Sequence, residues 1–205
     1  MISSKEIISK LDKIIPDPKC ELIYNKDYEL LIATVLSAQS TDKRVNEVTK
    51  ILFSKYNLED LSRIDIKEIE RIIKPVGTYI RKAVYIKEIA NRLINDYKGI
   101  VPNNREYLES LNGVGRKTTN VVLSNLFDTP AFAVDTHVSR VSKRLGIAKD
   151  SDDVLIIEKK LMKFFPKEKW SRLHHQFVLF GRYICKSKKM DCNNCPFNNK
   201  CQHKK

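Results

Sequence analysis

The chain of 205 residues is long enough to bury a sizeable core, as one large domain or two small ones. Its 38 lysine and arginine residues outnumber its 25 aspartate and glutamate residues, and the net charge of +13 favours a polyanionic partner, because neutralised phosphates release counterions. No run approaches the roughly 20 apolar residues of a membrane span, and residues 1–13 lack the apolar centre of a signal peptide, so we expect a soluble, cytoplasmic protein.

Apolar residues recur at helical spacing throughout the sequence, without sustained alternation of period two. The first helix is expected to begin at a capping box of Ser3 and Glu6 and to end before Pro16. Further helices are expected from about Tyr28 to Leu36, from Thr41 or Asp42 to Tyr56, over 58–74, from about Ala83 to Tyr97, from Arg105 to Leu111, after Gly115, after Asp135, from Ser151 or Asp152 to Pro166, and over 168–184. The sequence therefore predicts an all-α fold.

A glycine-flanked turn interrupts the helical pattern of residues 104–127, where Gly113 and Gly115 enclose Val114. Helix, tight hairpin and helix is the expected order. Glycine can take a positive φ and let another backbone approach, and the N–H groups that begin the second helix suit a phosphate. An ordinary turn between helices is the alternative. Arg116 directly after the turn, in a strongly basic chain, favours phosphate binding.

Two charged residues near this turn stand out for their positions. Lys117 lies in the first turn of the second helix, where the helix dipole disfavours a cation and so favours a neutral, nucleophilic amine. Asp135 follows the apolar segment AFAV and precedes a helix with Val138 on its apolar face. A plain helix cap is the alternative role for Asp135.

The segments LNGVGRKTTNVVL and AFAVDTHVSRV together resemble the helix-hairpin-helix DNA glycosylases. Lys117 and Asp135 match the catalytic pair of the endonuclease III branch of that family. The resemblance implies that the lysine attacks the anomeric carbon of the sugar and that the aspartate assists. Asn112 departs from the family, which commonly has proline there. Since asparagine also forms turns, we expect a slightly looser hairpin with the same role.

Gln39 lies at a junction between helices, in the segment LLIATVLSAQSTD. From the residues alone, a solvated loop position is the alternative interpretation. The segment is similar to the part of endonuclease III whose glutamine enters the DNA stack that a flipped base has left. The resemblance therefore implies that the planar amide of Gln39 hydrogen-bonds the orphaned partner base.

The segment GTYIRKA resembles the second intercalating loop of the family, where a bulky apolar residue usually follows the glycine. Here Thr78 occupies that position, which places the wedge role in doubt. Tyr79 and Ile80 are the possible substitutes, and a simple helix cap is the alternative role of Thr78.

Four of the five cysteines fall near the end of the sequence, at Cys185, Cys192, Cys195 and Cys201. In a reducing compartment such a cluster suggests a metal centre before disulfides. Spacing alone leaves a structural zinc site and an iron–sulfur cluster as candidates. The resemblance implies the second, because endonuclease III carries a [4Fe-4S] cluster on the same spacing.

Lys186, Lys188 and Lys189 lie in the interval between the first two of these cysteines. A loop held by the cluster could present these lysines to DNA phosphates, and we expect that role. A solvated basic tail is the alternative.

The resemblance covers nearly the whole chain and implies two domains. A helical barrel is expected over residues 22–132, and an iron–sulfur cluster domain over 1–21 plus 133–205, with its cluster loop at 185–201. The implied enzyme is a monomer that excises oxidised pyrimidines from damaged double-stranded DNA and cleaves the strand by β-elimination through a lysine Schiff base. In a bacterium it would be associated with the nucleoid.

Two other functions remain open at this stage. An adenine-mismatch glycosylase would share the cluster, but that branch generally lacks the nucleophilic lysine and carries an added C-terminal domain, so Lys117 and the stop at Lys205 argue against it. A non-catalytic DNA-binding protein with a redox-sensing cluster is the second, and it would not need Lys117 and Asp135.

Overall fold

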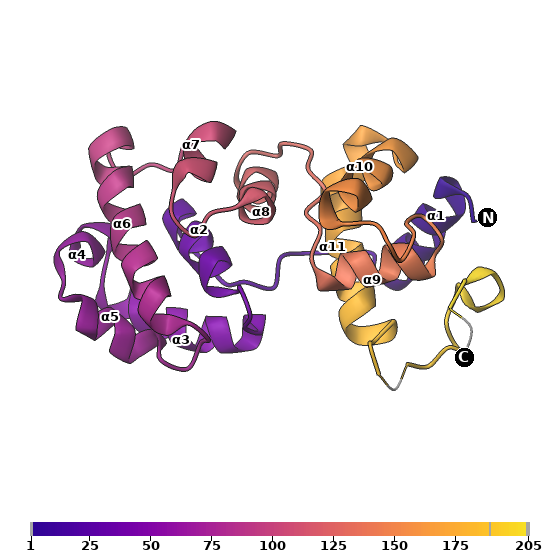
Figure 1. Ribbon diagram of the computed structural model, residues 1–205, viewed down its shortest axis with the longest axis horizontal. Helices are drawn as coiled ribbons and strands as arrows, with labels where there is room; N and C mark the ends of the chain where they lie inside the picture. Colours follow the sequence, from indigo (N-terminus) through magenta and orange to yellow (C-terminus); the bar gives the residue numbers. More distant parts are fainter. Residues whose placement is uncertain (1, 189, 204–205) are drawn as a thin grey trace. The chain divides into compact units, whose positions relative to one another are not determined.

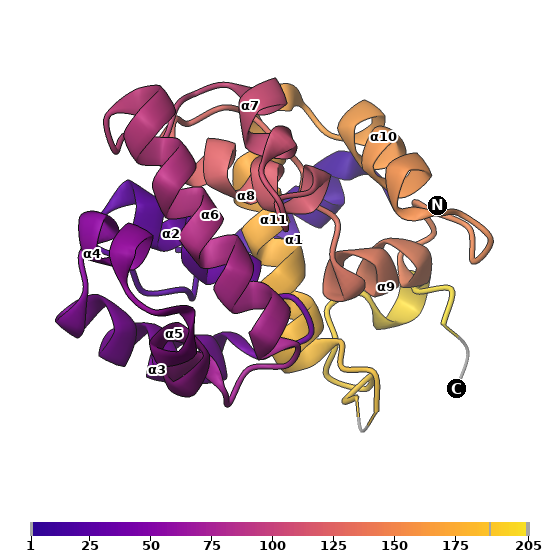
Figure 2. The same cartoon turned by 60° about the vertical axis from the view of Figure 1, so that its left-hand side comes forward.

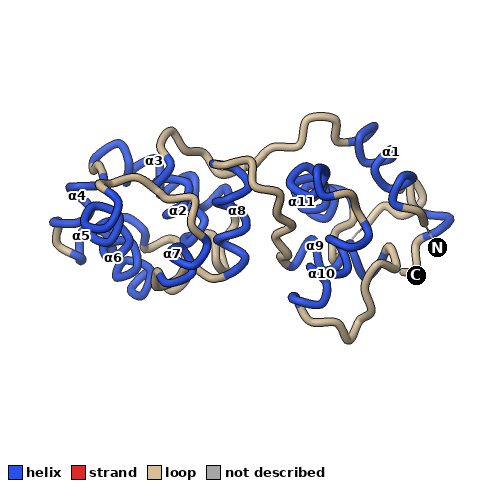
Figure 3. Tube along the Cα trace, turned by 90° about the horizontal axis from the view of Figure 1, so that it is seen from above, coloured by secondary structure: helices blue, strands red, loops and turns tan. Residues whose placement is uncertain are grey.

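The computed structural model describes residues 2–188 and 190–203, and all regular elements in this part of the chain are helical. Figures 1 and 3 show helices joined by loops, with no strand among the described residues. The predicted all-α fold is thereby confirmed. The chain divides into a central unit, Cys20–Phe127, and a terminal unit made of Met1–Lys19 and Asp128–Lys205.

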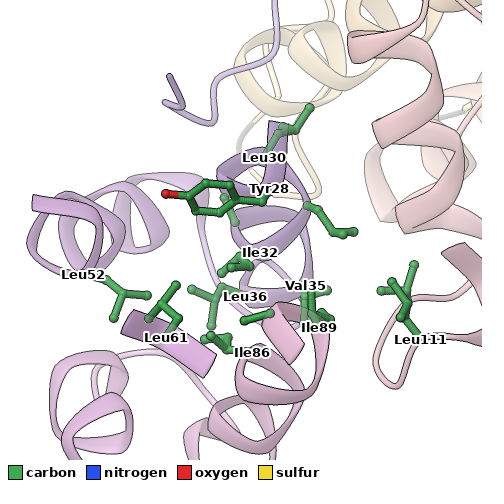
Figure 4. Close-up of a cluster of buried hydrophobic side chains, with 14 of the residues drawn as sticks. Tyr28, Leu30, Ile32, Val35, Leu36, Leu52, Leu61, Ile86, Ile89 and Leu111 are labelled. Carbon is green, nitrogen blue, oxygen red and sulfur yellow. The ribbon is translucent and has the colours of Figure 1, made fainter. Parts of the chain in front are cut away.

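The central unit is built around one buried helix. Its helices are α2 (Asp27–Leu36), α3 (Asp42–Lys55), α4 (Leu58–Arg63), α5 (Ile66–Ile73), α6 (Tyr79–Tyr97), α7 (Arg105–Ser110) and α8 (Arg116–Leu126). All residues of α2 after Asp27 are buried. Figure 4 shows Leu52 and Leu61 on one side of α2 and Leu111 on the other. Because α2 packs on all sides, its C-terminal end is held firmly, and Gln39 follows that end directly.

The longest helix, α6, packs against α4, α5 and α2 (Figure 2). Its apolar residues recur at positions that face the core, among them Ile86, Ile89 and Leu93, all fully buried. Lys82 continues this same stripe one turn earlier and is also buried. The helix begins after Thr78, so it connects the loop at 76–78 with the interior of the unit.

The terminal unit has a separate core of aromatic and aliphatic side chains. Its helices are α1 (Ser4–Ile14), α9 (Thr136–Arg144), α10 (Val154–Phe164) and α11 (Trp170–Leu179), with 3-10 turns at Lys167–Lys169 and Asn198–Lys200 and a π-helical turn at Phe180–Ile184. Phe132, Phe177 and Phe180 lie in this core, each no more than 1% exposed. The first helix is tied to α11, because Asp12 accepts hydrogen bonds from Arg172 and Gln176, each 2.9 Å long.

The helix expected over residues 58–74 is in fact two helices, α4 and α5. The side chain of Asp65 accepts a hydrogen bond from the Lys67 N–H at 2.9 Å and so starts a new helix. Ile64, just before it, has the extended ψ of 152°. The apolar period continues across the break, which is why periodicity alone joined the two segments.

Two other predicted boundaries are also wrong in detail. The cap of α10 is Asp153, whose carboxylate accepts the Ile156 N–H at 2.8 Å, and neither Ser151 nor Asp152 takes that position. The single helix expected over 168–184 changes from a 3-10 turn to α11 and then to a π turn. Apolar spacing hardly distinguishes these hydrogen-bond patterns, so the sequence could not separate them.

Candidate functional site

The hairpin between α7 and α8 depends on one glycine more than on the other. Gly113 has φ of 82°, and a Cβ there would overlap the ring of Tyr85 on α6, so both its conformation and the available space exclude a side chain. Gly115 has an extended backbone with φ of −99°, and a Cβ there would meet nothing within 4 Å. The predicted requirement for glycine in this turn therefore holds at Gly113, and Gly115 could carry a side chain. Val114, between them, is buried.

Asn112 anchors the hairpin to α6. Its side-chain amide donates to both carboxylate oxygens of Glu88, at 3.0 and 2.8 Å. Proline, the residue expected from the family resemblance, has no donor for this contact. The substituted residue thus adds a side-chain connection to the longest helix, and the expectation of a slightly looser hairpin stays a prediction.

Lys117 lies in the first turn of α8 and is half-buried. The capping position of α8 is Gly115, so no side chain caps the helix, and its first turn contains no acidic residue. Arg116 adds a second cation to this turn and is exposed. The helix start is thus positively charged by its dipole and by two side chains, which suits an anion.

Asp135 caps α9 in the terminal unit and is half-buried. Its Oδ1 accepts a hydrogen bond from the Val138 N–H at 2.7 Å. The segment before it is also fixed, because the carbonyl of Ala133 is 2.8 Å from Nδ1 of the buried His174. The carboxylate is therefore held in one orientation by the helix that it caps.

Gln39 and Thr78 share a rare backbone conformation. Both have φ of 56°, in the left-handed region that residues with a Cβ seldom adopt, and both are exposed. Their loops are adjacent, since a Cβ on Gly77 would lie 3.4 Å from the Gln39 carbonyl oxygen. Such backbone strain costs on the order of 1–3 kcal/mol and is often kept at functional sites.

Thr78 precedes α6 but does not cap it through its side chain. Its hydroxyl donates to the neighbouring Gly77 carbonyl at 2.7 Å. Of the two candidate substitutes for the wedge, Tyr79 packs against the core of the central unit, whereas Ile80 is 57% exposed. Of the two substitutes, Ile80 in the first turn of α6 is therefore the exposed one.

The four cysteines of the tail are half-buried, and none is in a disulfide. Burial raises the pKa of the Cys195 thiol, with a smaller contribution from the charges of Cys185, Cys201 and Cys192. The Cys195 thiol thus lies within electrostatic reach of the other three, and four thiolates are the donor set of an iron–sulfur cluster. Among the described residues, however, no three His, Cys, Asp or Glu side chains converge on a position for a metal ion.

The end of α9 holds both ends of the cysteine tail. The guanidinium of Arg144 donates to Cys185 Sγ at 3.2 Å and to the Lys186 carbonyl at 2.7 Å. The carbonyl of Arg144 accepts bonds from the Gln202 N–H at 2.9 Å and from Cys201 Sγ at 3.3 Å. Lys186 and Lys188 are exposed, as a phosphate contact requires. The predicted contact residue Lys189 lies outside the described residues.

Sequence reasoning missed several residues that support these positions, above all Lys82, Glu88 and Arg144. Lys82 could have been found, because it lies four residues before Ile86 on the apolar stripe of α6. A charged residue on such a stripe needs buried partners. Glu88 and Arg144 carry no comparable signal, since both resemble ordinary charges on a helix surface.

Comparison with known proteins decides the family. Residues 32–167 match the model of the HhH-GPD superfamily base excision DNA repair proteins. The chain belongs to this family. Within it, endonuclease III of Bacillus subtilis (strain 168) is 48% identical over 206 residues, covering 98% of this chain and 94% of its own. Endonuclease III of Rickettsia prowazekii (strain Madrid E) is 46% identical over 200 residues, covering 97% and 92%.

A solved structure of a trapped covalent intermediate of endonuclease III with DNA has 48% identity to the chain. Its TM-score is 0.93, and the match covers 98% of this chain and 97% of that one. The predicted resemblance to the endonuclease III branch is confirmed, and with it the enzyme class of base-excision-repair DNA glycosylase and AP lyase. In the described part of the chain, no helix has the length and apolar character needed to cross a membrane.

Proposed function

We propose that this enzyme excises oxidised pyrimidines from double-stranded DNA and then cleaves the strand, with Lys117 as nucleophile and Asp135 as its partner. It acts as a monomer in the cytoplasm, on nucleoid DNA if the source is a bacterium. The observation that carries the proposal is the uncapped, doubly cationic start of α8 behind the Gly113 hairpin. This is an anion site with an amine in it.

Recognition of the damaged nucleotide begins at the phosphates. The N-terminal end of α8, with Gly113, Val114, Gly115 and Arg116, binds a backbone phosphate, and the exposed Lys186 and Lys188 bind others. Lys189 has the same role by its place in the sequence. The damaged base leaves the stack, at a lower cost than an undamaged base because its stacking is weaker. Gln39 then contacts the orphaned base, with the Thr78 loop beside it.

Chemistry follows at the anomeric carbon of the extruded nucleotide. The carboxylate of Asp135 stabilises the positive charge that develops on the sugar as the glycosidic bond breaks, and the electron pair of that bond leaves with the base. The neutral Nζ of Lys117 forms a bond to the same carbon, and loss of a proton and opening of the sugar ring give an imine. Removal of a proton from the adjacent carbon then expels the 3′ phosphate by β-elimination. The trapped covalent intermediate of the related endonuclease III supports this sequence.

The four tail cysteines are proposed to hold a [4Fe-4S] cluster. Their number, the absence of a disulfide among them and the electrostatic reach of Cys195 to the other three support that group. When bound, the cluster supplies a rigid cross-link in a loop that has little apolar content of its own. Cys185 and Cys201 are already tied to α9 through Arg144, so the cross-link would fix the lysines of the loop relative to that helix.

A panel of lesion-containing duplexes tests the proposal, with base release and strand cleavage measured separately. Release and cleavage at oxidised pyrimidines, such as thymine glycol, are the expected result. Release of adenine opposite 8-oxoguanine without cleavage would instead support the mismatch glycosylase. Tight binding without either product would support the non-catalytic DNA-binding protein.

A further inference from the structure

Lys82 is a buried lysine whose partners are backbone carbonyls. It is 3% exposed, and its Nζ donates to the Leu36 carbonyl at 2.9 Å and to the Ala38 carbonyl at 2.6 Å. No carboxylate is among its partners in the described part of the chain, and burial alone lowers the pKa of Lys82. Burying an ammonium group is costly unless its protons are hydrogen-bonded, so these two contacts must be close to ideal.

The two carbonyls belong to the turn that presents Gln39. Leu36 is the last residue of α2. Ala38 directly precedes Gln39, whose backbone is left-handed. A cation at the C-terminal end of a helix is also favoured by the helix dipole. The bond to Leu36 satisfies a buried carbonyl at the end of α2, whereas Ala38 is an exposed residue beyond that end. Satisfying the helix end therefore explains the bond to Leu36 and leaves the bond to Ala38 to be explained.

The backbone of the same residue holds the neighbouring loop. The Lys82 N–H donates to the Thr78 carbonyl at 3.1 Å as the first backbone hydrogen bond of α6, and Thr78, like Gln39, is exposed and has a left-handed backbone. A Cβ on Gly77 would lie 3.4 Å from the Gln39 carbonyl oxygen, so the two strained turns touch. Strained conformations persist only where their surroundings fix them. Lys82 bonds to both segments, through its side chain to the turn after α2 and through its backbone to Thr78.

We propose that Lys82 is a positioning residue for recognition of the orphaned base. It holds the turn after α2 so that the exposed side chain of Gln39 is ready to enter the DNA stack before DNA arrives. The inference rests on the proposed role of Gln39 in the excision reaction. Preorganisation lowers the entropy that would otherwise be lost when the turn is ordered on binding. Loss of Lys82 should therefore change the two properties that depend on Gln39. The affinity for the opened duplex should fall, and the preference among orphaned bases should weaken.

Equilibrium binding to duplexes without a cleavable base tests this inference. The probes carry a tetrahydrofuran abasic-site analogue opposite each of the four bases. Gln39→Ala should weaken binding about three- to tenfold and reduce the preference among the four bases, as expected for a lost hydrogen bond. Lys82→Met, which keeps the chain length and removes the donors, should produce the same two changes. The double variant should be no weaker than Gln39→Ala alone.

Lys87→Met is the matched control. Lys87 lies on the same helix, and its Nζ also donates to a carbonyl that ends a helix, that of Ile64 after α4. That turn carries no proposed DNA contact. Lys87→Met should therefore lower thermal stability to a similar extent while leaving affinity and base preference unchanged. Amide hydrogen exchange over residues 38–40 should accelerate in Lys82→Met and not in Lys87→Met.

The outcomes separate the inference from the function on which it rests. If Gln39→Ala changes nothing, the proposed role of Gln39 is wrong, and the role of Lys82 is wrong with it. If Gln39→Ala has the expected effect and Lys82→Met does not, or if the two losses add in the double variant, only the role of Lys82 is overturned. Should Lys82→Met fail to fold, Lys82→Gln replaces it. That variant keeps an N–H donor. If amide exchange over residues 38–40 accelerates in Lys82→Gln while its base preference stays unchanged, the inference is contradicted.

Discussion

The two helices that carry the proposed catalytic residues begin in opposite ways. At the start of α8, Gly115 offers no capping side chain and the first turn holds Arg116 and Lys117, which the helix dipole disfavours. At the start of α9, Asp135 caps the helix with a 2.7 Å hydrogen bond, as a great many aspartates do. Lys117 occupies a position that the helix dipole disfavours, whereas Asp135 occupies the position that aspartate favours. A functional residue that follows the rules cannot be detected from local geometry.

The opposite end of α9 widens the contrast. Arg144 holds the cysteine tail there, so α9 is fixed at its start by its cap and at its end by the tail. The start of α8 has no side-chain cap, and the hairpin before it is held against α6 by Asn112 and Gly113. Substitutions in α8 should therefore affect chemistry and DNA contact, whereas those in α9 should affect chemistry and stability together.

Removing the unfavourable cation of α8 should have the largest effect. Lys117→Gln is expected to abolish strand cleavage and borohydride trapping of the enzyme on DNA, because no amine is left to form the imine. Lys117→Arg should fail as well, since a guanidinium stays protonated and offers no free electron pair. Binding to abasic-site duplexes and thermal stability should be retained. Trapping by Lys117→Gln at the wild-type level would assign the nucleophile to another residue.

Neutralising the cap of α9 separates its two roles. Asp135→Asn keeps the capping oxygen and removes the charge, so base excision should fall about 10²- to 10³-fold while the free energy of unfolding changes by less than about 1 kcal/mol. Single-turnover excision and thermal melting measure the two quantities. Asp153→Asn, at the equivalent cap of α10, is the control and should leave excision unchanged. Equal excision by both variants would reduce Asp135 to a helix cap.

Disrupting the tail tests the second anchor of α9. Purified protein should contain roughly four irons and four sulfides per chain, and Cys192→Ser should lose them. Without the cluster, the loop that carries Lys186 and Lys188 keeps its hydrogen bonds to Arg140 and Arg144 but loses the cross-link, so DNA binding should also weaken. Cys20→Ser, in the central unit, should keep its iron. Stoichiometric zinc in protein prepared without air would contradict the iron–sulfur assignment.

Giving α8 a cap like that of α9 should have the smallest effect. Gly115 is extended and open, so Gly115→Asp fits without strain and should stabilise the fold by about 0.3–1 kcal/mol. The new carboxylate should weaken DNA binding if α8 meets a phosphate. Asn57→Asp adds the same charge at the start of α4 and serves as control. Stabilisation in Gly115→Asp without any loss of affinity would place the phosphate elsewhere.

Much of this fold was predictable because its signals are local. Ser3 and Thr41 cap their helices as their positions indicated, with side chains that accept the N–H groups of Glu6 and Arg44. The break before α5 was not predictable, since Asp65 interrupts the backbone without interrupting the apolar period. Local caps are visible in a sequence when they coincide with a change of pattern, and invisible when the pattern continues through them.

The sequence predicted the residues of the candidate site but not the residues whose contacts hold them in place. Lys117 drew attention because its position is unfavourable, and the cysteines because of their spacing. The contacts Asn112–Glu88 and Lys82–Leu36 join residues 24 and 46 positions apart in the sequence. Their partners are decided by tertiary packing, which one sequence does not reveal. The left-handed backbone of Gln39 is of the same kind, because glutamine has no local preference for it.

The discontinuity of the terminal unit has a consequence for synthesis on the ribosome. In the described structure, helix α1 bonds to residues that are synthesised late, since Lys10 donates to the Pro196 carbonyl at 2.8 Å and Glu6 pairs with Lys200 at 2.7 Å. At roughly 5–20 residues per second, α1 waits on the order of 10–40 s, with its apolar face at Ile7 and Leu11 uncovered. The central unit, contiguous in sequence, has all its residues well before then. Nascent chains stalled near residue 160 should therefore show a protease-resistant central unit and a cleavable α1, which makes α1 the segment most dependent on chaperones.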